Sequence, residues 1–505
     1  RMASKDLSGT SNWLVFDGPV DTLWIESMNT VLDDNKKLCL VSGEIIKMSP
    51  YMRMMFEPPD LDEASPATVS RVGVVFMEPS RLGWEPILES WLARLPASTL
   101  LPEVESMRKI MHWLMLPCMF FVTEYCKRPT PITIMEMANN AFRLFTAMTH
   151  DPFALNEMRK EAMENDGDVE AVPVAKFPIP KGKDLAKYME NTTIFCILWS
   201  FGGVVDKPSR AIFDDLMRSL LTGTIREERS EQWNLFMAKN PGYKGSALED
   251  RKLLDKLPDK GTLFDCRFNR LNFKWEGWMK SAARDDKIPD DAKFNDIIIP
   301  TVDTVRSEFV MKCLIENGCH VLVTGETGTG KSVSIKAMLK RGLDQNVYSH
   351  IFVQFSAQTT ENQTQDIIDG KLGKRRKGVF GPPPGYTSVV FVDDLNMPKK
   401  EEYGAQPPIE LLRTWMDHDG WYDRFDPAWA FRNIVSVQFV AAMGPPGGGR
   451  SNITQRYVRH FNMINYVPFD DSSLVRIFEK ITGWFLGKSS GLKNTSFPSS
   501  VRKAG

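Results

Sequence analysis

One glycine-rich stretch of eight residues constrains the fold of this chain more than any other feature. It reads Gly325-Glu326-Thr327-Gly328-Thr329-Gly330-Lys331-Ser332. The run 319–324 before it is apolar and suits a buried parallel strand, and residues 333–340 after it carry apolar side chains at helical spacing. A strand, a loop of the form G-x-x-x-x-G-K-S and a helix, in this order, predict a phosphate-binding P-loop.

The residue types of this stretch indicate what it binds. The glycines allow a tight turn in which successive backbone N–H groups face inward and form an anion site. Lys331 would reach the β- and γ-phosphates of a nucleotide, and the Ser332 hydroxyl would hold Mg²⁺. The expected cofactors are therefore ATP or ADP and Mg²⁺. The competing interpretation, a glycine-rich turn with a chance lysine, is disfavoured by the flanking strand and helix.

A pair of acids follows the apolar run 389–392. Asp393 and Asp394 stand at the C-terminal end of this expected strand, which is where ligands bind in an open parallel sheet. We expect Asp393 to hold Mg²⁺ through water and Asp394 to act as the base that polarises an attacking water. A strand that simply ends in a turn is the alternative, and the P-loop upstream makes it the weaker one.

Composition limits the class of protein. The chain has 505 residues, enough for about three or four domains, and its net charge of −1 points to neither nucleic acid nor a membrane as partner. Seven cysteines are scattered singly without zinc spacing, which fits a reducing cytoplasm. The most hydrophobic segment, 110–122, is too short to span a bilayer, so we expect a buried helix there.

The pattern of apolar runs predicts two α/β units with a helical region between them. In the helical region we expect helices at 84–95, 101–124, 132–148 and 185–199, and a further one capped by Ser209. The charged stretch 226–265 looks like a connector, and the aromatic-rich stretch 268–278 like a small β-element. In the second α/β unit the run 434–442 predicts one strand, and the tail 488–505 is expected to be disordered.

Several classes of P-loop protein compete for the second α/β unit. A GTPase would carry an Asn-Lys-x-Asp motif, which the sequence lacks. The run Lys374-Arg375-Arg376-Lys377 could imitate the lid of a small-molecule kinase, but such a run is more often a solvated loop. The segment before the P-loop and the arginines after the last strand favour an AAA+ module. There the adenine would pack on Ile298, Pro300 and Thr301, and a neighbouring module would contribute an arginine in trans.

Longer strings make the assignment more specific. The first unit carries Trp13-Leu14-Val15-Phe16-Asp17-Gly18-Pro19 and Ser65-Pro66-Ala67-Thr68-Val69-Ser70-Arg71. The second carries Asp393-Asp394-Leu395-Asn396-Met397-Pro398 and Met443-Gly444-Pro445-Pro446-Gly447-Gly448-Gly449-Arg450. Over nearly its whole length the chain resembles the motor ring of dynein heavy chains, more the axonemal than the cytoplasmic type. The first unit resembles the second AAA+ module of that ring, and the second unit the third.

The resemblance implies a fold class of tandem AAA+ modules, each an α/β large subdomain with an all-α small subdomain. It implies the following division of the chain: 1–83, C-terminal part of the second module's large subdomain; 84–225, its helical small subdomain; 226–295, a connector with a small β-element; 296–469, the third module's P-loop large subdomain; and 470–505, the start of its small subdomain and a tail.

The resemblance also implies roles for individual residues. Asp17 matches a Mg²⁺-binding acid, but Gly18 stands where a catalytic Glu would be, so that site would bind nucleotide without turning it over. Arg71 matches the arginine finger that reaches the first module's ATP. Arg456, with Arg459 as the alternative, would reach the nucleotide of the second module.

At the third module's site, two replacements weaken the expected chemistry. Asp394 replaces a Glu and is one methylene shorter, and a shift on the ångström scale can cost about 10²-fold in rate. Gly444 replaces the Asn that commonly orients the attacking water. We therefore expect this site to bind ATP and to hydrolyse it slowly, as a regulatory site.

For the whole protein the resemblance implies ATP-driven, minus-end-directed movement along microtubules in cilia. The implied locations are the cytoplasm, the cytoskeleton and the ciliary axoneme. The implied partners are neighbouring AAA+ modules of the same heavy chain and, through parts outside this chain, microtubules and dynein intermediate and light chains. Two alternatives remain open: a non-hydrolysing structural or regulatory nucleotide-binding module, and a different AAA+ ATPase that remodels other assemblies.

Overall fold

The fold is that of a computed structural model, which describes most of residues 3–487. Within that span, residues 7, 19, 21, 59, 79–81, 96, 244–252, 280–287, 290–291, 295–296 and 403, and most of 151–176, are not described. The tail 488–505, for which the sequence predicts disorder, also lies outside the described residues. The chain divides into two compact units, residues 1–82 with 399–407 and residues 83–398 with 408–505.

The first unit is built on a pair of parallel strands. Its elements are η1 (Ala3–Lys5), β1 (Asn12–Phe16), α1 (Thr22–Leu32), β2 (Lys37–Cys39), β3 (Ile45–Lys47), β4 (Met52–Phe56) and α2 (Pro66–Val69). β1 pairs in parallel with β4, and the rings of Phe16, Trp24 and Phe56 stack between these strands and α1. Parallel strands joined through a helix confirm the predicted α/β arrangement of this unit.

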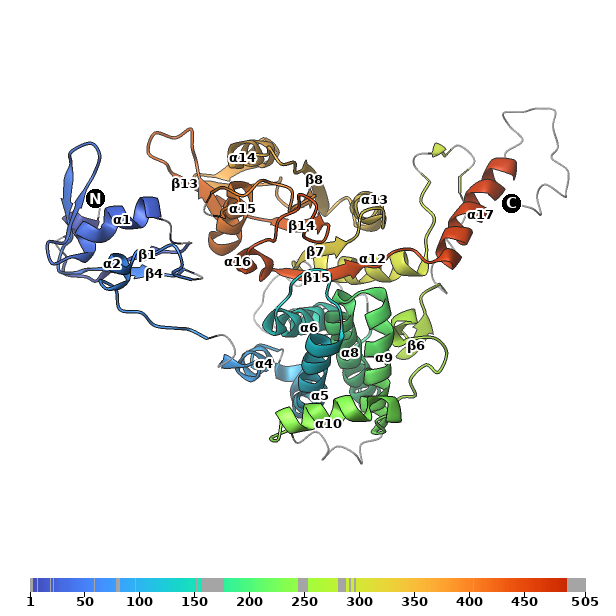
Figure 1. The fold of residues 1–505 in the computed structure, drawn as a ribbon. Coiled ribbons are helices and arrows are strands. Elements are labelled where there is room, and N and C mark those ends of the chain that lie inside the picture. The colour runs from blue at the N-terminus through green and yellow to red at the C-terminus, as the bar shows by residue number, and fades with distance from the viewer. Residues whose placement is uncertain are drawn as a thin grey trace. The chain divides into compact units, whose positions relative to one another are not determined.

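The second unit begins with a helical region (Figure 1). Its helices are α4 (Glu85–Leu92), α5 (Ala97–Tyr125), α6 (Ile134–Thr149), α8 (Lys183–Phe201), α9 (Lys207–Thr222) and α10 (Ser230–Lys239), with short turns η3 (Gly202–Val204), η4 (Glu227–Arg229) and η6 (Leu263–Asp265). α5 contains the predicted buried helix, with Ile110, Leu114 and Val122 in the core. Among the described residues, no helix combines the length and the apolar character needed to cross a membrane.

Two expectations for the helical region are corrected. The stretch 226–265 is not only a connector, because it contains α10, whose buried Phe236 packs against the rings of Phe120 and Tyr243. Ser209 does not cap α9. The helix begins earlier, at Lys207, because the Asp206 side chain accepts the Ser209 backbone N–H at 3.0 Å. The small β-element is confirmed as the hairpin β5 (Cys266–Asn269) and β6 (Lys274–Gly277).

The P-loop lies in a five-stranded parallel sheet in the order β15-β7-β14-β11-β8. Its strands are β7 (His320–Gly325), β8 (Tyr348–Gln354), β11 (Thr387–Asp393), β14 (Val437–Met443) and β15 (Phe461–Tyr466). The accompanying helices are α12 (Val302–Ile315), α13 (Lys331–Ala337), the π-turn η8 (Met338–Gly342), α14 (Glu361–Asp369), α15 (Pro407–His418), α16 (Gln455–Val458) and α17 (Asp471–Gly487). Because all five strands are parallel, the segments that follow β7 and β11 meet at one edge of the sheet.

A second, smaller sheet corrects two further expectations. It has the order β12-β13-β10-β9, formed by β9 (Gly373–Arg376), β10 (Val379–Gly381), β12 (Gly420–Tyr422) and β13 (Phe431–Ile434). The run 434–442 is therefore not one strand. Ser436 adopts a left-handed φ of 55°, which separates β13 from β14. The basic run 374–377 is not a loop, since most of it forms β9, and Arg375 donates to the Pro382 carbonyl at 2.7 Å.

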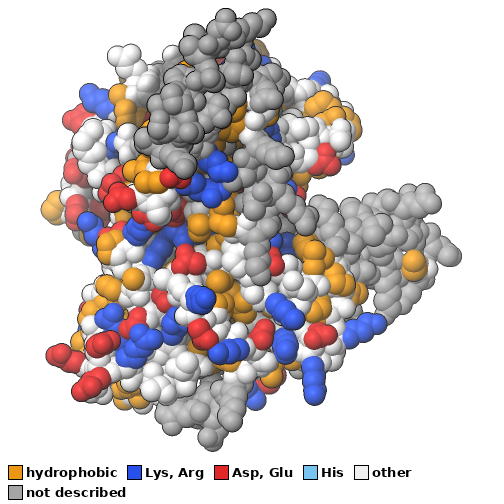
Figure 2. All heavy atoms as spheres, turned by 90° about the vertical axis from the view of Figure 1, so that its right-hand side faces the viewer, with side chains coloured by type: hydrophobic (Ala, Val, Ile, Leu, Met, Phe, Trp, Pro, Cys, Tyr) orange, Lys and Arg blue, Asp and Glu red, His pale blue; other side chains and the backbone are white. Residues whose placement is uncertain are grey.

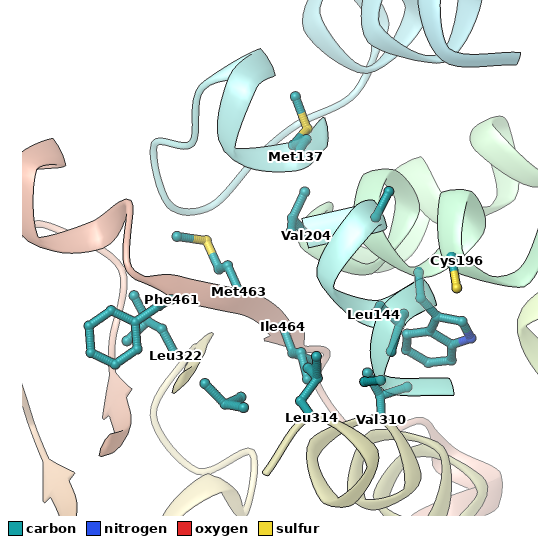
Figure 3. Close-up of a cluster of buried hydrophobic side chains, with 14 of the residues drawn as sticks. Met137, Leu144, Cys196, Val204, Val310, Leu314, Leu322, Phe461, Met463 and Ile464 are labelled. Carbon is teal, nitrogen blue, oxygen red and sulfur yellow. The ribbon is translucent and has the colours of Figure 1, made fainter. Parts of the chain in front are cut away.

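The helical region and the P-loop sheet share one hydrophobic core. Figure 3 shows side chains of α6, α8 and η3 near side chains of α12, β7 and β15, among them Leu144, Leu314 and Ile464. A buried polar link runs beside this core: the backbone carbonyl of Asn465 accepts from Arg210 of α9 at 2.7 Å, and its side-chain Oδ1 accepts from the Thr324 hydroxyl of β7 at 3.2 Å. The helices are thus linked through Asn465 of β15 to β7, the strand that leads into the P-loop.

His320, at the start of β7, gives this core a pH dependence. Burial lowers the pKa of His320 to about 4, and its Nδ1 accepts the Phe439 backbone N–H at 3.0 Å. Because the unfolded chain takes up this proton near pH 6.5 and the folded chain does not, stability falls as the pH drops from 6.5 towards 4.

We therefore expect the free energy of unfolding to fall by about 2 kcal/mol between pH 7 and pH 5 through this group. Urea denaturation at both pH values should show a smaller fall for His320→Asn, whose amide oxygen can still accept a hydrogen bond. The nearby His460 has its pKa lowered by burial too and is present in both proteins, so the difference reports on His320. Equal falls in the two proteins would contradict this assignment.

Candidate nucleotide site

The loop after β7 has the backbone of a phosphate-binding turn. Gly325, Gly328 and Gly330 adopt positive φ angles of 146°, 85° and 75°. A Cβ added at Gly325 would lie 2.5 Å from the Tyr466 carbonyl oxygen, so the neighbouring strand leaves no room for a side chain. Glycine is required at this position by both the backbone conformation and the close approach of β15.

Lys331, the first residue of α13, folds back over this loop. Its Nζ donates to the carbonyl oxygens of Gly325 at 2.8 Å and Glu326 at 2.6 Å. Burial first, and then the positive charge of Arg450, lower the pKa of Lys331, while nearby carboxylates oppose this shift. The ammonium group therefore lies inside the turn, within reach of anything that the loop amides bind.

Ser332 and Asp393 meet across the sheet edge. The Ser332 hydroxyl donates to Asp393 Oδ1 at 2.7 Å, and Lys336 Nζ lies 3.2 Å from Asp393 Oδ2. Asp393 is the buried last residue of β11. A hydroxyl and a carboxylate this close provide the hard oxygen donors that Mg²⁺ prefers, so the residues present fit the expected ion.

Asp394 is held in an unusual conformation beside this pair. Its φ of 53° is left-handed, and its Oδ2 accepts from Gln354 Nε2 at 2.8 Å. Arg450 lies 3.9 Å from its other oxygen, a distance too long for a hydrogen bond. The carboxylate thus faces the site from the end of β11, and the amide of Gln354, at the end of β8, restrains it.

Sequence reasoning missed three residues of the site: Gln354, Asn396 and Arg450. Asn396 is fully buried, and its Nδ2 donates to the Gly444 carbonyl at 2.9 Å. The available signals were the place of Gln354 at the end of a strand and the presence of Asn396 and Arg450 in the two characteristic strings. Their contacts join residues about 40 to 60 positions apart, which no local pattern reveals.

The segment expected to hold adenine leads into α12. Ile298 is exposed, and Thr301 caps the helix through a reciprocal hydrogen-bonded pair with Thr304. The Pro300 carbonyl accepts from Arg476 of α17 at 3.1 Å. The segment is therefore fixed at one end by a helix cap and at its middle by α17.

In the first unit, Asp17 and Arg71 each lie shortly after a regular element. Asp17 is exposed and directly follows β1, with Gly18 next to it. Arg71 follows α2, where it pairs with Asp33 and donates to the Ala67 carbonyl at 2.7 Å. Arg71 is therefore bound to its own unit through its Nε and one terminal nitrogen.

In the second unit, the sequence predicts Arg456, with Arg459 as the alternative, as the counterpart of Arg71. Arg456 lies inside the short helix α16, whereas Arg459 is the first residue after that helix. Arg459 also pairs with an aspartate, Asp417, at 2.6 Å, as Arg71 pairs with its own. The position after the helix and the aspartate partner favour Arg459 as the counterpart of Arg71.

Comparisons with known proteins agree with this architecture. Residues 107–280 match the family model "Dynein heavy chain AAA lid domain", and residues 286–469 match "P-loop containing dynein motor region". The chain is 40% identical over 490 residues to dynein axonemal heavy chain 3 of Mus musculus, which covers 97% of this chain and 11% of that protein. Dynein axonemal heavy chain 1 of Homo sapiens is 41% identical over 498 residues, covering 95% of this chain and 11% of the relative.

The match extends to dynein axonemal heavy chain 12 of Mus musculus, 40% identical over 481 residues, with 94% of this chain and 14% of that relative covered. The chain spans about a tenth of the length of the first relatives it matches. Both family models and all three relatives agree on one family. The chain therefore belongs to the dynein heavy chain family, as part of a motor region of the axonemal type with AAA+ P-loop architecture.

Proposed function

We propose that residues 325–332 bind ATP or ADP with Mg²⁺ as one nucleotide site of an axonemal dynein motor ring. The observation that carries this proposal is the 2.7 Å contact between the Ser332 hydroxyl and Asp393, at the edge where the P-loop opens. On binding, Lys331 would exchange its two loop carbonyls for phosphate oxygens. The loop amides would hold the phosphates, and the segment with Ile298, Pro300 and Thr301 would pack on the adenine.

The proposed role of this site is regulatory. Asp394 is one methylene shorter than the usual glutamate, is tied to Gln354 and lacks help from a side chain at Gly444. Each of these features acts against placing a water for attack, since catalysis depends on alignment to within about 1 Å. Slow hydrolysis would leave the site in one nucleotide state for long periods, which suits a site that regulates the other modules of the ring.

Three further assignments belong to the same proposal. Asp17 would serve as the Mg²⁺-binding acid of the second module's site, where Gly18 supplies no base. Arg71 would reach the nucleotide of the preceding first module. Arg459, in place of Arg456, would reach the nucleotide of the second module, after release from Asp417.

For the whole protein we propose ATP-driven, minus-end-directed movement along microtubules in the ciliary axoneme. The partners would be the neighbouring AAA+ modules and, through other parts of the heavy chain, microtubules and intermediate and light chains. The proposal follows from family membership.

The surface charge of the chain is mixed. On the face of the molecule drawn in Figure 2, the described acidic and basic side chains are intermixed, which fits a surface without a dominant charge.

A magnesium titration tests the nucleotide site. In Ser332→Ala the hydroxyl is lost while the P-loop amides and Lys331 remain, so ATP affinity without Mg²⁺ should stay within about twofold of wild type. The gain in affinity on adding Mg²⁺ should fall by about tenfold, which equals 1.4 kcal/mol. Isothermal titration with and without Mg²⁺ measures both. An unchanged magnesium effect would show that Ser332 is not part of the metal site.

A further inference from the structure

The loop between β14 and α16 returns sharply towards the candidate nucleotide site. Gly447, Gly448 and Gly449 all adopt positive φ angles, of 119°, 57° and 87°. Backbone hydrogen bonds join Gly447 and Arg450 in both directions, at 3.0 and 3.1 Å. Three left-handed residues in a row turn the chain within a few positions, and only glycine does so without strain. The turn places the side chain of Arg450 beside Gly444 and Asp394.

Asn396 fixes both ends of this loop. Its side-chain amide donates to the Gly444 carbonyl at 2.9 Å, and its own carbonyl accepts the Ser451 backbone N–H at 3.0 Å. Asn396 is fully buried and lies two residues after Asp394. The position of the loop is therefore tied to the same strand end that carries the acids Asp393 and Asp394.

The side chain of Arg450 fills the space that Gly444 leaves empty. A Cβ added at Gly444 would lie 2.9 Å from Arg450 Nε and 3.0 Å from its Cδ. The Nε atom is buried and has no hydrogen-bond partner among the described residues. The terminal nitrogen is 3.9 Å from Asp394. Packing against Gly444 thus places the guanidinium. Its N–H donors do not form a hydrogen bond with the Asp394 carboxylate.

Arg450 also lies close enough to Lys331 to act on it electrostatically. After burial, the charge of Arg450 is the largest influence that lowers the pKa of Lys331. Asp394, Asp393 and Glu326 act on Lys331 in the opposite direction. The Arg450 guanidinium and the Asp394 carboxylate come together just after β11, at the sheet edge where the P-loop opens, and the terminal phosphate of a nucleotide on the loop would lie at this edge.

We propose that Arg450 is the residue by which this site distinguishes a nucleoside triphosphate from a diphosphate. The inference rests on the proposed nucleotide site and deepens it. A planar guanidinium donates two parallel hydrogen bonds to phosphate oxygens, which the terminal phosphate of ATP offers and ADP lacks at that point. Arg450 belongs to the same module as the P-loop, so this site would distinguish ATP from ADP without a residue from a neighbouring module. The loss of a side chain at Gly444 is what makes room for it.

The test compares two ligands in the same variants. Calorimetric titration of the 505-residue chain with a non-hydrolysable ATP analogue and with ADP, both with Mg²⁺, gives the two affinities. Arg450→Gln should weaken binding of the triphosphate at least tenfold and leave that of ADP within twofold. Arg450→Lys, which keeps the charge but not the fork, should give a smaller selective loss.

Gly444→Ala provides a second, independent variant. Its Cβ would displace the Arg450 side chain without removing it, so the same selective loss of triphosphate affinity is expected. Equal losses for both ligands, or no loss for either, would overturn the role of Arg450. Lys331→Ala tests the nucleotide site independently of Arg450. If this variant binds both ligands as wild type does, the proposed nucleotide site is wrong, and not only the role of Arg450. Thermal melting of each variant shows that it is folded.

Discussion

Lys331→Ala is expected to weaken binding of ATP and of ADP by at least about 100-fold, below detection in a calorimetric titration. The ammonium group lies inside the turn, where it makes two hydrogen bonds to its own loop, to Gly325 and Glu326. Charge-assisted hydrogen bonds to phosphate are worth about 1.5–3 kcal/mol each, and alanine removes all that Lys331 would make. Both nucleotides lose affinity because both carry the β-phosphate.

Lys340→Ala is the matched control for this experiment. Lys340 lies in the π-turn that continues α13, is exposed, and packs over the ring of Phe352 away from the loop. The same charge is removed from the same helical segment, so a general electrostatic effect would appear in both variants. We expect near wild-type nucleotide affinity for this control. Similar losses in the two variants would mean that Lys331 acts only through net charge.

Leu144→Ala is expected to lower the free energy of unfolding by about 3 kcal/mol, within the range of about 2–5 kcal/mol for leucine truncations in cores. Leu144 belongs to α6 of the helical region and lies in the core shared with the P-loop sheet (Figure 3). Because the core is shared, a cavity in the helical region should destabilise the sheet too. Nucleotide binding and helical circular dichroism should therefore be lost together, at a lower urea concentration than in wild type.

Leu235→Ala makes the same substitution on the exposed face of α10 and controls for the loss of a leucine as such. Its unfolding midpoint should stay within the small range typical of surface changes, about 0.5 kcal/mol. The result that would contradict a shared core is a Leu144→Ala protein in which helix content falls first while nucleotide binding persists. The helical region and the sheet would then unfold as separate units.

Much of the fold could be predicted from local patterns. Strands β7 and β11 are buried on both faces, so they appear in the sequence as continuous apolar runs, and the glycines after β7 mark the turn. α10 is hard to recognise because charged residues flank it and Phe236 is its buried residue, so only the packing of Phe236 reveals the helix. The break between β13 and β14 depends on the backbone of Ser436, a residue type that gives no such signal.

The residues of the candidate site divide in the same way, into those that a local sequence pattern predicts and those that only the fold brings together. The places of Gly325, Lys331, Ser332 and Asp393 follow from their residue types and their order in the sequence, so the motif predicts where they lie. The restraint on Asp394 by Gln354 and the placement of Arg450 over Gly444 join distant strand ends, and these contacts exist only in the folded sheet. The choice between Arg456 and Arg459 likewise depends on where a short helix ends, which residue identity alone does not fix.

A structure of the chain with a non-hydrolysable ATP analogue and Mg²⁺ is the most direct measurement of nucleotide and metal binding at this site. We expect phosphate density within the loop 325–332, contacted by Lys331, and a magnesium ion between the Ser332 hydroxyl and Asp393. Full-length density for the nucleotide with no metal there, or no density at Lys331 under saturating conditions, would contradict this expectation.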